Sequence, residues 1–266
     1  MPDTTTPTMT FVLLHGSWHG AWCWQRVADR LRSLGHRVTT PNQTGVGERS
    51  HLISADITLD TFVEDIVNHI THEELDDIVF VGHSFGGIPM TGVADRIPER
   101  IRHLVYLDSL ILQSGKTLFS TYPPHVVEER KKQALATPGG LGLPAPPATF
   151  FGMQAGTADE AWVQRRLTPQ PLSLYSSPLN LNNPIGNGLP RTYIYCTNPA
   201  VALAEPMRQW VRDQGDWGWR EIATGHNAMI TAPEELTAML LDIGRKTAPR
   251  SLTTHRLQRL HREQAT

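Results

Sequence analysis

IVFVGHSFGG, residues 78–87, is the stretch of sequence that decides the fold of this chain. Its apolar start at 78–81 predicts a short buried strand, and Gly82-His83-Ser84-Phe85-Gly86 follows at once as a G-x-S-x-G pattern. Small residues two positions before and after the serine are typical of a sharp strand-to-helix turn, the nucleophile elbow, because larger side chains would clash there. The turn exposes the serine hydroxyl at a helix start, where the helix dipole favours negative charge. Ser84 is therefore a candidate nucleophile, with an ordinary Gly-Ser turn as the alternative.

Strands and helices alternate on both sides of this turn. The apolar patterns predict strands at 11–14, 36–40, 78–81, 101–107, 191–196 and 219–222. Helices are expected between them: one with Trp24, Val27, Leu31 and Leu34 on one face and ended by Gly35, one begun by Thr58, one through about Arg96, one around 207–211 and one at 233–246. This alternation predicts βαβ units and an α/β fold with a mostly parallel sheet flanked by helices.

The alternation stops at about residue 110. Residues 111–189 are rich in Pro and Gly, with helical patterns only near 123–136 and 158–167. We interpret them as a cap inserted over the sheet, with 1–110 and 190–250 as the core. A disordered linker is the alternative, against which the apolar residues of this segment argue. The basic, polar tail at 251–266 is expected to be a loosely attached helix or a frayed end.

Composition limits the classes of partner and compartment. The 266 residues suit one large domain, and a net charge of −2 indicates neither a nucleic acid nor an anionic membrane as partner. No apolar run approaches the ~18 residues of a membrane span, and the polar first ten residues do not resemble a signal peptide. Cys23 and Cys196 form no CxxC motif. Two such thiols favour a reducing compartment, so we expect a cytoplasmic protein.

A serine nucleophile needs a base and donors for the developing oxyanion. Among twelve histidines, His226 fits best as the base, because it follows the last predicted strand in a late loop. The backbone N–H of Phe85, next to the nucleophile, and that of Ser17, in the loop after the first strand, are the expected oxyanion donors. Gly16 would let this loop approach the substrate.

Three motifs carry a resemblance to a known family: HGSWHGAW at 15–22, the elbow at 82–87, and Gly225-His226 with Ala228-Met229. Together they resemble the α/β-hydrolases, most closely the plant methylesterase and hydroxynitrile lyase group with its bacterial esterase relatives. The resemblance covers the chain from about residue 10 to 246. It implies an α/β-hydrolase fold with an inserted cap and a reaction without cofactor or metal. The lyases carry threonine where Gly16 stands and lysine where Asn227 stands, so the resemblance favours ester hydrolysis over cyanohydrin cleavage.

The acid of the expected triad departs from the family pattern. In the methylesterases it follows the strand that corresponds to 191–196, but CTNPA at 196–200 holds no carboxylate. The histidine needs a partner that fixes its tautomer and stabilises its cation. Asp108, at the end of a neighbouring strand, is the best substitute, although a helix or loop cap is an alternative role for it. Asn198 could orient a neutral histidine, whereas Glu205 and Asp213 are candidates that suit a helix surface.

These observations predict a serine hydrolase that cleaves a small to medium apolar carboxylic ester through an acyl-enzyme. Ser84 attacks, His226 transfers the proton and Asp108 orients His226. A lactone hydrolase or lyase on the same scaffold and a non-catalytic ligand sensor remain alternatives. The partner is then a small-molecule ester, with no nucleic acid and no membrane. Residues that could bind the substrate, each also a candidate for ordinary core packing or exposure, are Gly16, Trp18, His19, Trp22, Tyr122, Phe150 and Trp162.

Overall fold

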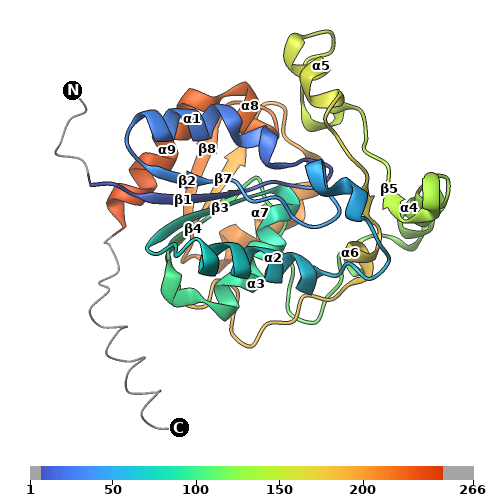
Figure 1. Cartoon of the computed structure of the whole chain (residues 1–266), viewed down its shortest axis with the longest axis horizontal. Helices are drawn as coiled ribbons and strands as arrows, with labels where there is room; N and C mark the ends of the chain where they lie inside the picture. The colour runs from blue at the N-terminus through green and yellow to red at the C-terminus, as the bar shows by residue number, and fades with distance from the viewer. Residues whose placement is uncertain (1–6, 248–266) are drawn as a thin grey trace.

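A six-stranded parallel sheet forms the centre of the molecule (Figure 1). The structure is a computed structural model that describes residues 7–247. The strands lie in the order β2-β1-β3-β4-β7-β8, and every neighbouring pair is parallel. Their bounds are β1 (Thr10–Leu14), β2 (Arg37–Thr39), β3 (Ile78–His83), β4 (Ile101–Leu107), β7 (Arg191–Cys196) and β8 (Gly218–Ile222). The predicted α/β class is confirmed, and all strands end at the same edge of the sheet.

Helices cover both faces of the sheet (Figure 1). The first face is covered by α1 (Gln25–Ser33), α8 (Ala228–Thr231) and α9 (Pro233–Lys246), and the second by α2 (Leu59–His72), α3 (Gly87–Arg96) and α7 (Glu205–Gln214). Along β3, Val79 and Val81 join the first core, while Ile78 and Phe80 join the second. A strand between two helical layers is buried on both faces, so it reads as a continuous apolar run.

The predicted helix ends agree with the structure, with one exception. Thr58 accepts a hydrogen bond from the Thr61 N–H at 3.2 Å, and the Thr58 N–H donates to the Thr61 hydroxyl at 3.1 Å. Gly35, with a φ of +85°, follows α1 in the left-handed conformation that suits a helix end. Leu34 was predicted on the packed face of α1 but is 55% exposed, because the helix ends at Ser33 and the chain turns away.

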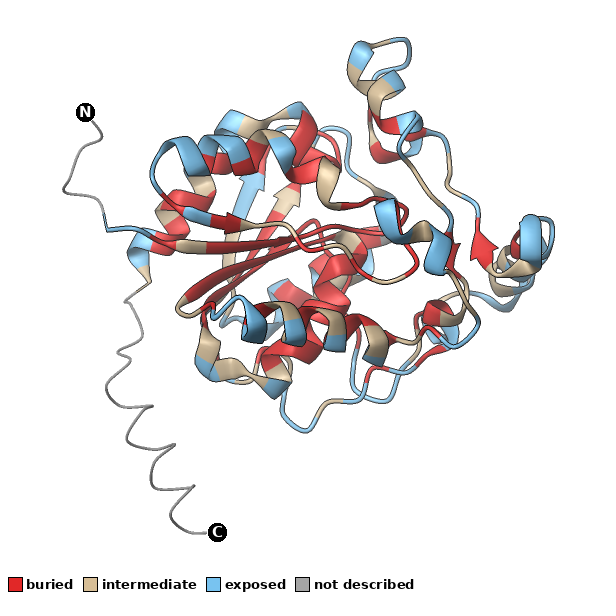
Figure 2. Cartoon of the chain, in the orientation of Figure 1, coloured by how far each residue is buried: buried red, intermediate tan, exposed pale blue. Residues whose placement is uncertain are grey.

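The chain between β4 and β7 extends over the edge where the strands end (Figures 1 and 2). It contains α4 (Pro124–Leu135), β5 (Gly142–Leu143), α5 (Ala158–Gln164), β6 (Gln170–Pro171) and α6 (Ser173–Ser176), with β5 and β6 paired antiparallel. The Trp18 indole donates to the Leu143 carbonyl at 3.1 Å, and the Trp18 N–H donates to the Gln170 side chain at 3.0 Å. This segment therefore packs on the loop that follows β1.

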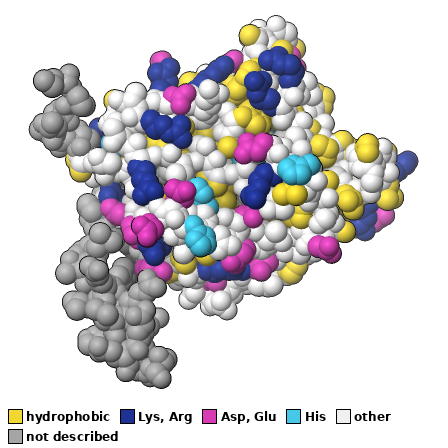
Figure 3. Space-filling view, viewed as in Figure 1, with side chains coloured by type: hydrophobic (Ala, Val, Ile, Leu, Met, Phe, Trp, Pro, Cys, Tyr) yellow, Lys and Arg dark blue, Asp and Glu magenta, His cyan; other side chains and the backbone are white. Residues whose placement is uncertain are grey.

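Short 3-10 helices complete the described elements. They are η1 (Ala21–Trp24), η2 (Gly47–Leu52), η3 (Ser84–Gly86), η4 (Pro98–Arg100), η5 (Leu118–Thr121), η6 (Pro138–Gly140), η7 (Ala148–Phe151) and η8 (Ala202–Ala204). None of the helices in residues 7–247 is both long and apolar enough to cross a membrane. Charges of both signs are interspersed on the face that Figure 3 shows. The predicted tail at 251–266 lies outside the described residues.

Candidate active site

The turn after β3 has the geometry of a nucleophile elbow. Ser84 has a φ of +53°, a left-handed conformation that residues with a side chain rarely adopt. A Cβ atom added to Gly86 would lie 2.5 Å from the His15 carbonyl oxygen, and one added to Gly82 would lie 3.0 Å from the Gly86 backbone. The two glycines are therefore required by close backbone contacts, and the turn leaves Ser84 partly exposed.

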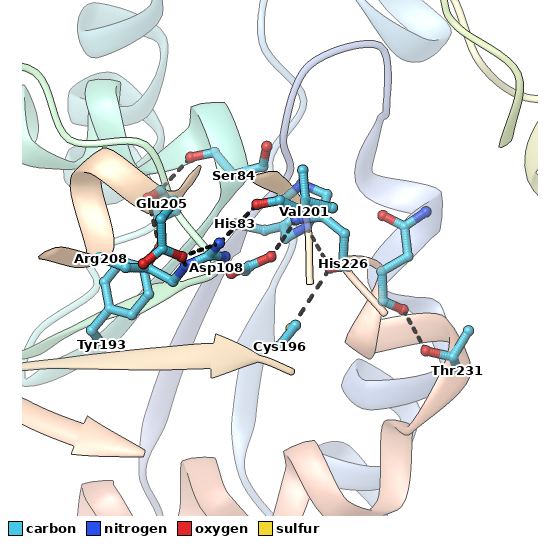
Figure 4. Close-up of polar contacts among 12 residues, drawn as sticks. His83, Ser84, Asp108, Tyr193, Cys196, Val201, Glu205, Arg208, His226 and Thr231 are labelled. Carbon is cyan, nitrogen blue, oxygen red and sulfur yellow. Dashed lines mark hydrogen bonds and ion pairs between the residues drawn. The ribbon is translucent and has the colours of Figure 1, made fainter. Parts of the chain in front are cut away.

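Asp108 lies at the end of β4, the strand beside β3. It is fully buried, with a φ of +41°, and its Oδ2 is 2.7 Å from Nδ1 of His226 (Figure 4). The next two residues hold the nucleophile's backbone: the Ser84 carbonyl accepts hydrogen bonds from the Ser109 hydroxyl at 2.7 Å and from the Leu110 N–H at 2.9 Å. One short segment thus fixes both the serine backbone and the imidazole.

The other candidates for the acid lie elsewhere. Asn198 is exposed, and its N–H donates to the Thr224 carbonyl at 3.0 Å. Asp213 is exposed on α7, where it accepts a hydrogen bond from Gln209. Glu205, also on α7, pairs with Arg208 rather than with a histidine. Among these candidates the structure brings Asp108 alone to the ring of His226.

Arg208 contacts the side of Asp108 that does not face the histidine. Its Nη1 is 3.2 Å from Asp108 Oδ1, its Nη2 is 2.7 Å from Glu205 Oε2, and the whole side chain is 1% exposed (Figure 4). Burial lowers the pKa of Arg208, but the hydrogen bond with Glu205 and the charge of Asp108 outweigh that effect and raise the pKa. The buried carboxylate therefore has a cation beside it. No local sequence pattern indicates this contact, since Arg208 is a hundred residues from Asp108.

His226 is held by its backbone as well as by its ring. His83 Nε2 is 2.9 Å from the His226 carbonyl oxygen, and burial holds the pKa of His83 well below its usual value. His83 is therefore neutral and donates that hydrogen bond. Ser84 and His226 line the same cavity, although the described contacts include no hydrogen bond between them. Such bonds are often long without substrate and shorten in the reacting complex.

The loop after β1 passes directly beside the nucleophile. A Cβ atom on Gly16 would lie 2.7 Å from the Ser84 Cβ atom. His15 Nδ1 is 2.9 Å from the Gly16 carbonyl, and His19 Nδ1 is 2.8 Å from the Ser17 carbonyl. Burial lowers the pKa of His15 to about 4 and that of His19 to about 3, so both rings are neutral and donate through Nδ1.

These contacts determine where the Ser17 N–H points. In a trans peptide the C=O and N–H groups point in opposite directions. The Gly16 carbonyl faces His15, so the Ser17 N–H of the same peptide points away from His15. No hydrogen bond occupies the Ser17 N–H within the part of the chain that the structure describes. A buried donor of this kind is available to a ligand oxygen.

A mostly apolar cavity connects the core to the segment above it. It is narrow in this structure, with a cavity volume of about 20 Å³, and it is open to solvent on one side. Its lining comprises Ser17, Trp18, Ser84, Leu110, Leu118, Tyr122, Arg130, Phe150, Phe151, Tyr175, Val201, Ala204 and His226. Trp18, Tyr122 and Phe150 were among the predicted substrate-binding residues. Sequence reasoning missed the charged residue Arg130 and the buried Tyr175, because each is brought here only by the packing of the segment between β4 and β7.

Four predicted substrate-binding residues do not line this cavity. The rings of Trp22 and Trp162 pack against each other with centroids 5.1 Å apart, so the two indoles fill a contact between η1 and α5. His19 is buried behind the loop, where its ring stacks on Trp22 at 5.3 Å. Gly16 packs against the Cβ atom of Ser84 and is not part of the cavity lining. Aromatic character alone could not distinguish packing residues from lining residues.

A metal site is not apparent among residues 7–247: no group of three or more His, Cys, Asp or Glu side chains could hold an ion. The two acids nearest the site, Asp108 and Glu205, are both engaged with Arg208. The functional groups that the structure brings to the cavity are the Ser84 hydroxyl, the His226 imidazole paired with Asp108, and the unoccupied Ser17 N–H.

Comparisons with known proteins agree with this geometry. A family model described as the alpha/beta hydrolase family matches residues 11–239. The carbendazim hydrolyzing esterase of a Nocardioides species is 40% identical over 244 residues, which are 88% of this chain and 99% of that protein. Methylesterase 2 of Arabidopsis thaliana is 28% identical over 222 residues, which are 76% of this chain and 82% of that protein.

A solved structure shows the same fold at lower identity. An extracellular alpha/beta-hydrolase from a Paenibacillus species has a TM-score of 0.78 and 24% identity, and the match covers 90% of this chain and 100% of that one. The resemblance predicted from the three motifs is thus confirmed. This chain belongs to the alpha/beta hydrolase family.

Proposed function

We propose that this protein is a serine esterase that cleaves small to medium apolar carboxylic esters through an acyl-enzyme. One observation carries the proposal: Ser84, in a strained elbow, shares an apolar cavity with His226, whose Nδ1 is 2.7 Å from the buried Asp108. The esterase and methylesterase names of the relatives support the ester as substrate class.

The proposed reaction assigns each group a step. His226 Nε2 takes the proton of the Ser84 hydroxyl as the oxygen attacks the acyl carbon. The N–H groups of Ser17 and Phe85 stabilise the resulting oxyanion. When the tetrahedral intermediate collapses, His226 returns the proton to the departing alkoxide, and an alcohol leaves. Water then attacks the acyl-enzyme with the same proton transfers and releases the acid. Asp108 keeps the Nδ1 proton in place and stabilises the imidazolium.

The first test asks whether Ser84 is the nucleophile. Wild-type protein should hydrolyse a p-nitrophenyl ester, and a fluorophosphonate should label it. Ser84→Ala should lose labelling and about a thousandfold or more of kcat, since one missing triad member disables the whole unit. Ser120→Ala, at an exposed position of η5, is the matched control and should retain both properties. Labelling of Ser84→Ala at the wild-type rate, or a wild type without turnover, as expected of a ligand sensor, would overturn the proposal.

A second pair of variants tests the acid. Asp108→Asn should lower kcat by several orders of magnitude, because the amide favours the wrong imidazole tautomer. Asn198→Ala should retain activity, because Asn198 does not contact His226 in the structure. Inactivity of Asn198→Ala alone would show that the assignment is incorrect. Lactones belong in the same substrate panel, because their opening is the same acyl transfer.

A further inference from the structure

One permanent charge interrupts the apolar lining of the cavity. Arg130, on α4, faces the same cavity as Ser84 and His226, while most of the other lining side chains are apolar or aromatic. It is half-buried, and no carboxylate or other hydrogen-bond acceptor in residues 7–247 pairs with its guanidinium. Nearly all other described Arg side chains that are partly or fully buried have such a partner, as Arg208 does with Asp108 and Glu205.

The charge of Arg130 acts on two tyrosines that line the cavity. Burial raises the pKa of both Tyr122 and Tyr175, and the charge of Arg130 opposes that rise at each of them. Tyr175 is fully buried, and the Ser17 side chain also opposes the rise in its pKa. Both tyrosines line the cavity, so the positive charge of Arg130 acts on the cavity wall.

The donor set at this end of the cavity matches an anion. A guanidinium carries five N–H donors and no acceptor, and its planar fork fits a carboxylate through two parallel hydrogen bonds. A half-buried cation without a partner has lost part of its hydration, which a ligand carboxylate would replace. A cationic group in the same position would be repelled, and a purely apolar one would leave the guanidinium unpaired.

The placement of α4 indicates where on the substrate the anion lies. Ser84 belongs to the core edge of the cavity, whereas α4 lies at the outer end of the segment above the sheet, beyond α6 (Figure 1). A ligand with its acyl carbon at Ser84 therefore meets Arg130 with its distal end. Apolar residues of the same lining, such as Leu118 and Phe151, would contact the connecting carbon chain.

We propose that Arg130 binds a carboxylate at the end of the substrate remote from the scissile bond, so that the preferred substrates are half-esters of dicarboxylic acids. This inference rests on the proposed esterase function and narrows its substrate class. Ser84 cleaves the ester at one end while Arg130 pairs with the free acid at the other.

The experiment compares selectivity rather than activity alone. The kcat/KM values of monomethyl half-esters, from succinate to suberate, are divided by those of the matching dimethyl diesters. Wild type should favour the half-ester of one chain length. Arg130→Met should lower that ratio about tenfold or more, the effect of losing a hydrogen-bonded charge pair. Arg130→Glu should lower it further. The wild-type ratio should also fall as salt screens the charge.

Lys131→Met is the matched control. Lys131 is the next residue of the same helix, its side chain is 48% exposed and it pairs with Glu128 at 3.0 Å. The variant removes the same charge from α4 and should keep the wild-type ratio. A ratio that is equal in wild type, Arg130→Met and Lys131→Met would overturn the inference, as would an equal loss in both variants.

A binding measurement separates this inference from the proposed function. Ser84→Ala should bind a monomethyl half-ester more tightly than its diester in calorimetry, and adding Arg130→Met should abolish the difference. If the diesters are turned over in a Ser84-dependent way but this difference is missing, the carboxylate site is refuted and the esterase stands. If the difference is present without turnover by wild type, the site stands and the proposed esterase function fails.

Discussion

Asp108 is contacted on both sides by charged or chargeable groups. Its Oδ2 faces Nδ1 of His226 at 2.7 Å, and its Oδ1 faces Nη1 of Arg208 at 3.2 Å. The positive charge of Arg208 is in turn partly neutralised by Glu205, whose side chain is 54% exposed. The cation offsets part of the negative charge that Asp108 presents to the imidazole. Through Asp108, the Arg208–Glu205 pair thus sets how strongly the imidazolium is stabilised.

This arrangement predicts opposite pH effects for two substitutions. Arg208→Met leaves Asp108 with its full negative charge, which favours the protonated imidazole, so the acid limb of the kcat/KM profile should move to higher pH. Glu205→Gln leaves Arg208 uncompensated and should move the limb to lower pH. Each displacement should be about half a pH unit or more. The measurement is the pH dependence of kcat/KM on a neutral ester.

Two further variants keep this prediction decisive. Arg212→Met is the control. Arg212 lies on the same helix, but it is 41% exposed and its closest approach to Glu205 is 3.8 Å, compared with 2.7 Å for Arg208. It should leave the acid limb in place. Removing one partner of a buried pair costs about 3–5 kcal/mol, so Arg208→Met could unfold the chain. Glu205→Gln changes an exposed group and remains informative in that case. Displacements in the same direction for both variants would contradict the charge network.

At the scale of elements, α2 shows how local and tertiary contacts share one helix end. The Thr58 side chain accepts from the Thr61 N–H, and the Leu59 N–H donates to the Ser177 hydroxyl at 2.9 Å. The first contact is local and visible in the sequence. The second comes from residue 177, which follows α6, and ties α2 to the segment between β4 and β7.

Loss of the local cap should destabilise the protein measurably. Thr58→Ala should lower the free energy of unfolding by about 1 kcal/mol, because it leaves a helix N–H unpaired. Urea denaturation checks the value. Thr58→Ser should recover most of it, because its hydroxyl can accept the same hydrogen bond. Thr71→Ala, at an exposed position of the same helix, should cost nothing. Equal losses at positions 58 and 71 would refute the capping role.

At the scale of the whole molecule, several histidines are buried in neutral form. Burial lowers the pKa of His15 to about 4, of His19 to about 3 and of His103 to about 4. In the unfolded chain the same groups have a pKa near 6.5. Below that pH the unfolded state binds protons that the folded state does not. The stability these histidines contribute is therefore fully present above about pH 6.5 and is lost as the pH falls towards 4.

The free energy of unfolding should consequently fall steeply as the pH is lowered below about 6.5. Each such histidine contributes about 1.4 kcal/mol per pH unit once the unfolded state is protonated, so three contribute about 3 to 4 kcal/mol between pH 6 and pH 5. The free energy of urea unfolding between pH 7.5 and pH 5 measures this slope. His103, bonded to Thr192 and Thr247, can be replaced outside the active site. His103→Gln should reduce the slope by about one histidine's share. A slope that does not change on this substitution would contradict the prediction.

The sequence by itself determined the features that depend on neighbouring residues. The elbow at Ser84 needs glycines two positions before and after the serine. A strand between two helical layers needs an apolar run. The cap of α2 needs only Thr58 and the N–H of the residue three positions later. Such patterns lie within one turn or one strand, so the α/β class and the sheet could be predicted. Motifs that follow strands also indicated His226 and Asp108, because parallel strands end at one edge of the sheet.

Only the tertiary structure decided which side chains meet across that edge. Asp108 lies against His226 from 118 residues away, and Arg208 reaches Asp108 from another helix. Trp22 and Trp162 pack together outside the cavity, while Arg130 lines it. No local pattern shows whether an aromatic or arginine side chain packs against the core or lines the cavity, because the residue type is the same in both cases. The packing of the segment between β4 and β7 on the core decides which side chains face the cavity.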